Sequence, residues 1–192
     1  MDAAHFVFAP FLGIVWCWQR LYVKAPSGRQ RLNVLAALNA MTQELCTVEN
    51  LTYITAETVC ELLHRLAGGH QGIPITIILD NARYQRCALV QAVAQELGIE
   101  LLYLPTYSPN LNLIERFWRF VKKQCLYSKY YADSTSFQQA ILTCIQQAPT
   151  THTEALEQLL TLRFQTFQDV PVIGDQQTVS KRSKKKVLSK AA

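Results

Sequence analysis

Two acidic residues stand where a buried strand and the start of a helix would bring carboxylates together. Asp80 follows the apolar run 75–79 (ITIIL), which is typical of a strand covered on both faces. Because ligands bind at the carboxyl ends of parallel strands, Asp80 is a candidate ligand-binding residue, and capping of the next turn with Asn81 is an equally good interpretation. Glu115 would lie in the first turn of a helix that begins near Asn112, where an Asn-x-x-Glu capping box is the competing interpretation.

The spacing of these two acids favours a shared site. The 34 residues at positions 81–114 predict a helix (86–97), a second buried strand (100–104) and a loop between prolines. This path returns the chain to the sheet edge that it left, so Asp80 and Glu115 would lie close together. Two carboxylates about 4 Å apart repel each other by about 4 kcal/mol at an effective dielectric constant of about 20, so the pair is costly unless a cation offsets the repulsion. Mg²⁺ suits it because this ion binds carboxylates together with substrate phosphates.

Other segments predict the elements that position these acids. Short apolar runs separated by turn residues across 2–50 indicate an antiparallel meander, and a helix follows at about 55–67 with Thr55 as its N-cap. Two more helices are predicted at 133–148 and 152–167. This order predicts an α/β fold in which helices flank a mixed sheet.

The composition is that of a globular domain: 49% of the 192 residues are hydrophobic and 17% are charged. We expect one compact body over residues 1–168 and a polar, basic, disordered tail over 169–192. The chain shows no signal peptide and no run of about 20 apolar residues, which excludes a membrane protein. Six cysteines without a C-x-x-C pair predict free thiols in a reducing compartment and exclude a zinc ribbon.

Basic residues gather in two places. The net charge of +5 comes from the tail, where 181–190 hold six basic residues and no acidic one, and the body is close to neutral. The tail is either a solvated end or an arm that contacts phosphates without sequence preference, through Lys181, Arg182, Lys184, Lys185 and Lys186. After Glu115, a second group shares one helix face: Arg116, Arg119 and Lys123. These three are either an ordinary solvated face or contacts to a DNA backbone.

Three strings of this sequence, MDAAHF, ILDNARYQ and LPTYSPNLNLIERFW, resemble the catalytic domain of DDE transposases (DDE superfamily endonucleases). The most similar group is that of bacterial insertion sequences related to mariner elements, and the resemblance runs from Asp2 to about Phe167. It implies a ribonuclease-H-like, retroviral-integrase-like α/β fold. It also implies that Asp2, which alone reads as an exposed terminal acid, joins Asp80 and Glu115 in a catalytic triad that binds two Mg²⁺ or Mn²⁺ ions.

The implied reaction is metal-dependent DNA cleavage and strand transfer at insertion-sequence ends. The implied partners are element-end and target DNA and a second copy in a homodimer, in a bacterial cytoplasm at the nucleoid, with no small-molecule cofactor and no membrane. Thr106 and Leu113 stand where the family often has proline, and these differences leave the acids in place. Only Met1 precedes Asp2, and for this reason we expect a truncated first strand. The alternative is therefore an inactive transposase remnant that binds DNA non-specifically. A stand-alone ribonuclease-H-like nuclease fits the proline-loop string less well.

Overall fold

A computed structural model of the chain describes residues 1–8, 16–20, 22, 30–70, 72–105 and 108–164. The strands are β1 (Asp2–Val7), β2 (Arg31–Leu38), β3 (Leu45–Asn50), β4 (Ile75–Leu79) and β5 (Ile99–Tyr103). The helices are α1 (Ala56–Gly69), α2 (Ala88–Glu96), α3 (Leu113–Cys125), α4 (Ser134–Thr151) and α5 (Thr153–Leu159), with short 3₁₀ turns η1 (Arg83–Gln85) and η2 (Pro109–Leu111). The predicted helix at 55–67, the strands at 75–79 and 100–104, and the helices near 86–97, after Asn112 and at 133–148 are confirmed with small shifts at their ends, and Thr55 is the N-cap of α1 as expected. The helix expected at 152–167 ends at Leu159.

The predicted meander forms a three-stranded antiparallel sheet in the order β1-β2-β3, with Asp2 opposite Ala36. A tight turn joins β2 to β3: Asn39 donates its N–H to Glu44 O (2.9 Å), and Gln43 adopts a positive φ of 61°. β4 and β5 pair in parallel, which places the ends of both strands at one edge.

The start of β1 forms a backbone hydrogen bond to the second sheet. The Met1 ammonium donates a hydrogen bond to Ile78 O (2.7 Å), and from Asp2 onward β1 pairs with β2. A groove of about 930 Å³ lies beside this junction, lined by residues from the ends of β2 and α1, from β4 and from the start of α3. The strands therefore fall into two hydrogen-bonded sheets, one of β1, β2 and β3 and one of β4 and β5.

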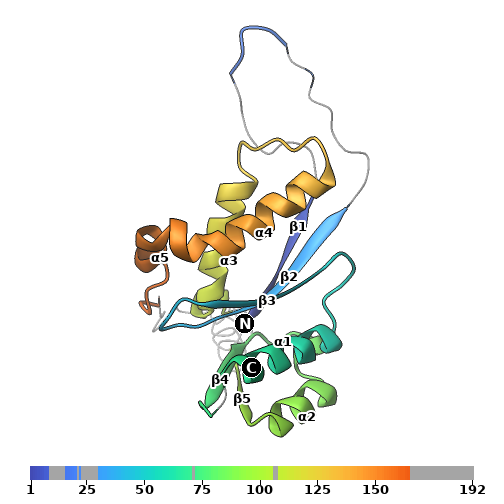
Figure 1. Cartoon of the computed structure of the whole chain (residues 1–192), viewed down its shortest axis with the longest axis vertical. Coiled ribbons are helices and arrows are strands. Elements are labelled where there is room, and N and C mark those ends of the chain that lie inside the picture. Colours follow the sequence, from blue (N-terminus) through green and yellow to red (C-terminus); the bar gives the residue numbers. More distant parts are fainter. Residues whose placement is uncertain (9–15, 21, 23–29, 71, 106–107, 165–192) are drawn as a thin grey trace, which may run out of the picture.

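Helices cover both faces of the three-stranded sheet, as Figure 1 shows. Alternation along β2 explains why. Val34 and Ala36 pack with α3, α4 and α5 in one core, which also contains Phe6 of β1. Leu35 points to the opposite face and packs with α1, α2, β4 and β5 in a second core. The first core holds α3, which carries Glu115, and the second core holds β4, which precedes Asp80.

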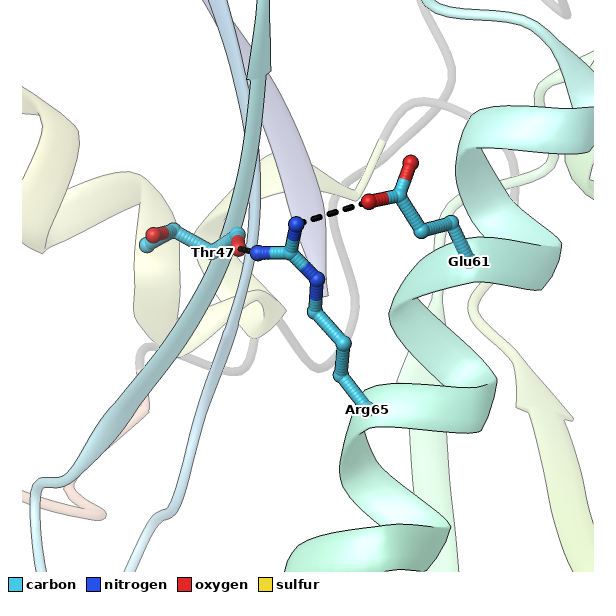
Figure 2. Close-up of polar contacts among 3 residues, drawn as sticks. All are labelled: Thr47, Glu61 and Arg65. Carbon is cyan, nitrogen blue, oxygen red and sulfur yellow. Dashed lines mark hydrogen bonds and ion pairs between the residues drawn. The ribbon is translucent and has the colours of Figure 1, made fainter.

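The outer edge of the sheet is tied to α1 by one arginine. Arg65 donates one hydrogen bond to Thr47 O on β3 (2.6 Å) and another to Glu61 Oε1 (2.7 Å), as Figure 2 shows. β3 is the terminal strand of its sheet, so the Arg65 bond satisfies an edge carbonyl. Because the Arg65–Glu61 pair is half-exposed, we expect it to contribute little to stability.

The structure also bears on the expectations for the N-terminal apolar run, the tail, the cysteines and membrane-spanning helices. One apolar run of the predicted meander is 13–18; its described part, residues 16–18, lies outside any strand, and Trp16 and Trp18 are fully exposed. Residues 9–15 and the tail 169–192 lie outside the described residues. All six cysteines are free thiols, as predicted. Across the described residues, no helix combines the length and apolar character that crossing a membrane requires.

Candidate metal centre

Three separate elements bring Asp2, Asp80 and Glu115 together. Asp2 is the first residue of β1, Asp80 follows β4, and Glu115 lies in the first turn of α3. One carboxylate oxygen from each residue lies within 4.8 Å of the other two. The return of the chain to the same sheet edge, predicted from the 34-residue spacing, is what places Asp80 and Glu115 side by side.

The amphipathic pattern of α3 sets the direction of Glu115. Ile114, Phe117, Trp118 and Val121 are buried and pack against the sheet. Glu115 follows Ile114 around the helix and is half-buried, so it lies at the margin of this core and beside the end of β4. The apolar residues of this helix, Phe117, Trp118, Phe120 and Val121, predict a core face; three of them are buried, and Phe120 is partly buried against the same core.

The loop after Asp80 is held by the neighbouring strand. Asn81 donates its side-chain amide to Leu104 O (2.7 Å), and the Tyr103 hydroxyl donates to Gln85 O (3.1 Å). The turn η1 has Ala82 as its N-cap and no side-chain cap hydrogen bond. The interpretation that Asp80 and Asn81 cap the next turn is therefore wrong.

The capping box expected at Asn112 and Glu115 is also wrong. Asn112 is the N-cap of α3, but its side chain makes no cap hydrogen bond. Its amide nitrogen instead donates to Asp80 Oδ1 (3.2 Å) and to Met1 O (3.4 Å). The carboxylate of Glu115 is thereby left to the acidic cluster.

The cluster carries negative charge in a poorly solvated place. Burial raises the pKa of Asp2 to about 7, and the charges of Glu115 and Asp80 add to this effect against a hydrogen bond from Ala3 N–H. Burial lowers the pKa of the Met1 ammonium to about 6, although Asp2 and Asp80 act in the opposite direction. Among the described residues, the one ion pair is Arg65–Glu61, so no arginine or lysine there pairs with the three acids.

The charges of Asp2 and Asp80 also act on Tyr84. Tyr84 is not among the residues predicted from the sequence. Burial raises the pKa of its hydroxyl to about 12, and the negative charges of Asp2 and Asp80 contribute. Tyr84 stands four residues after Asp80 in the ILDNARYQ string, which is the signal that could have identified it.

The donor set fits a hard divalent cation. Three carboxylates supply oxygen ligands and leave coordination positions for water or phosphate, which is the arrangement that Mg²⁺ and Mn²⁺ favour. A cation would also offset the repulsion that raises the pKa of Asp2. Asp2, Asp80 and Glu115 are the residues that would hold it.

Arg116 departs from the expectation that it contacts DNA. Its guanidinium donates to Leu159 O (3.3 Å), Thr161 O (2.7 Å) and Arg163 O (2.7 Å), and it stacks on the Phe164 ring at 5.2 Å. Leu159 is the last residue of α5, where helix geometry leaves carbonyls unpaired, and Thr161 and Arg163 follow it. Three of the five N–H donors of Arg116 are thus engaged within the chain, and they tie α3 to the end of α5.

We expect Arg116→Gln to lower the free energy of unfolding by about 1.5–3 kcal/mol, because charged hydrogen bonds to three carbonyls are lost. Urea unfolding followed by circular dichroism measures this change. Arg119→Gln is the matched control, since Arg119 is exposed on the same helix, and it should stay within about 0.5 kcal/mol of wild type. Equal losses in both variants would contradict the anchoring role of Arg116.

The remaining predicted DNA contacts fall into two groups. Arg119 and Lys123 have exposed side chains on α3, on the helix that carries Glu115. Lys181, Arg182, Lys184, Lys185 and Lys186 lie outside the described residues.

Comparisons with solved structures show the same architecture. The chain aligns with the Mos1 mariner strand transfer complex (TM-score 0.57, 15% identity, 87% of this chain and 54% of that one). It aligns similarly with the Mos1 paired end complex with Mn (TM-score 0.55, 14% identity, 87% and 55%). A simian T-cell lymphotropic virus intasome in complex with PP2A regulatory subunit B56 gamma also aligns (TM-score 0.50, 17% identity, 90% and 57%). The fold is thus the ribonuclease-H-like α/β fold of transposase and integrase catalytic domains, and the chain spans little more than half the length of these structures.

Sequence comparison gives the family. A search of curated proteins finds no match to the chain. The family model for the DDE superfamily endonuclease matches residues 19–138, which is more than half of the chain and includes Asp80 and Glu115. Asp2 lies ahead of the matched segment and joins the other two acids through the fold. The chain belongs to the DDE superfamily endonuclease family.

Proposed function

We propose that this chain is the catalytic domain of an insertion-sequence transposase related to mariner elements, which cleaves and joins DNA at the ends of the element. The observation that carries this proposal is the meeting of Asp2, Asp80 and Glu115 from three elements within 4.8 Å. Mos1 structures, described as a strand transfer complex and a paired end complex with Mn, have the same fold and support the choice of reaction and metal.

The chemistry follows from what the carboxylates hold. Two Mg²⁺ or Mn²⁺ ions bound there would supply Lewis acidity for the attacking and leaving oxygens of a phosphodiester. Asp2 must be ionised to act as a ligand, so a cation competes with the proton that burial favours. Arg119 and Lys123 would contact the DNA backbone beside Glu115, because their side chains are exposed on α3.

The domain limits and partners complete the proposal. Residues 1–168 form the catalytic domain, and the basic residues of the 169–192 tail add contacts to DNA without sequence preference. A second copy of the chain, in a homodimer, would pair the two element ends. A second candidate, a remnant that binds DNA without cleaving it, is favoured by the split between β1 and β4.

Metal-dependent stabilisation and nicking test the proposal together. We expect millimolar Mn²⁺ or Mg²⁺ to raise the melting temperature, since binding to the folded state alone contributes about 2.7 kcal/mol at 100 times Kd. The same ions should convert supercoiled plasmid to nicked circles, and EDTA should abolish this. Stabilisation without nicking would favour the remnant. The absence of both stabilisation and nicking would overturn the proposed function.

A further inference from the structure

Asn112 occupies the junction between the two sheets. Its amide nitrogen lies 3.2 Å from Asp80 Oδ1 and 3.4 Å from Met1 O, and the residue is 3% exposed. A backbone carbonyl and a carboxylate are both acceptors, so the NH₂ group must face them rather than the amide oxygen. The two N–H bonds of one amide therefore link Asp80 to the residue directly ahead of Asp2.

This bridge matters because the two sheets share an apolar core but, among the described strands, no strand pairing. β1 and β4 belong to separate sheets, and the direct backbone bond recorded between them is that of the Met1 ammonium to Ile78 O. Met1 and Asp2 are consecutive residues. The Met1–Ile78 bond and the two bonds of Asn112 are thus polar links that hold Asp2 beside Asp80, in addition to the apolar packing of Met1 in the second core.

The local role expected of Asn112 is taken by its backbone alone. Asn112 O accepts a hydrogen bond from Glu115 N–H (3.2 Å), while the side chain gives up the cap bond usual at this position. Burying an amide without using it locally is costly, so its long-range partners must account for its place.

We propose that Asn112 is a positioning residue of the metal site, which holds the Asp80 carboxylate and the start of β1 so that Asp2 and Asp80 face the same cation. This inference rests on the proposed function. An N–H bound to one oxygen of Asp80 fixes the carboxylate and leaves its second oxygen for a cation, as groups behind metal ligands commonly do.

The test is calorimetric titration of the full chain with Mn²⁺ at about pH 8, where Asp2 is ionised. Asn112→Leu keeps a similar volume and removes both donors, and we expect its Kd for Mn²⁺ to rise by about 10- to 100-fold. The melting temperature is measured in parallel, so that loss of folding is separated from loss of affinity.

A matched control removes a similar buried amide whose hydrogen-bond partners lie outside the acidic cluster. Asn33 is fully buried and donates to Asn50 Oδ1 (3.0 Å) and Thr52 O (2.9 Å), opposite His5 in the sheet. Asn33→Leu should lower the melting temperature but leave the Kd for Mn²⁺ within about twofold of wild type, because distant sites act independently.

The outcomes separate the two proposals. A folded Asn112→Leu chain with the wild-type Kd would overturn the positioning role. Should that variant not fold, Asn112→Ala, which leaves room for a water, must still weaken Mn²⁺ binding, and an unchanged Kd overturns the role equally. If the wild-type chain does not bind Mn²⁺, or if Asp80→Asn binds it as tightly as wild type, the proposed function itself fails and the role of Asn112 with it.

Discussion

Replacing Asp80 with Asn is expected to lower metal-dependent DNA nicking on the order of a thousandfold, equivalent to about 4 kcal/mol of transition-state stabilisation. Asn has the same shape but no charge, so the cluster that Asp2, Asp80 and Glu115 form loses one anionic ligand. Glu115→Gln should have a similar effect for the same reason. Gel separation of supercoiled and nicked plasmid over time measures the rates.

Folding stability should move in the opposite direction, which distinguishes a lost ligand from a damaged fold. In the metal-free chain, Asp80→Asn removes one of the charges that raise the pKa of Asp2, so the melting temperature should stay equal or rise. Mn²⁺ should stabilise the variant less than wild type. Glu96→Gln, on the exposed end of α2, is the charge-matched control and should nick at the wild-type rate. Wild-type nicking by Asp80→Asn would exclude the acidic cluster as the catalytic site.

Elements with a clear periodicity could be predicted from the sequence. The run 75–79 is apolar throughout and forms β4, and the spacing of Ile114, Phe117 and Val121 gives the buried face of α3. Both segments are specified by neighbours along the chain, and the position of Asp80 and Glu115 follows from them.

Side chains with distant partners could not be placed in this way. Asn112 fits a local capping pattern, but its partner Met1 lies 111 positions away. Arg116 fits a solvated basic face, but its acceptors lie 43 to 47 positions further along. For a polar residue with several possible partners, the tertiary fold determines which one lies within hydrogen-bond distance. The local spacing of residues along the chain does not predict that partner.

The affinity for Mn²⁺ should depend on pH, because burial raises the pKa of Asp2. With a pKa of about 7 in the folded chain, Asp2 must lose a proton to bind, so affinity should rise about tenfold per pH unit up to about 7 and then level off. Titration calorimetry between about pH 5.5 and 8 measures this slope. Asp2→Asn should bind more weakly with a flatter profile, whereas Glu96→Gln should keep the wild-type slope.

Without metal, the contribution of Asp2 to folding stability falls as pH rises toward about 7, whereas its contribution to Mn²⁺ affinity rises. The folded chain keeps the Asp2 proton between about pH 4 and 7 while the unfolded chain has released it, so Asp2 makes stability fall as pH rises through this window. The Met1 ammonium acts in reverse: its pKa is lowered from 8.0 to about 6, so stability rises as pH increases from about 6 to 8. The two contributions place a minimum of metal-free stability between about pH 6 and 7. Saturating Mn²⁺ should remove the Asp2 contribution to this minimum because a bound cation takes the place of the proton. A metal-free melting temperature that rises steadily from about pH 4 to 7 would show that Asp2 is better solvated than its position at the start of β1 implies.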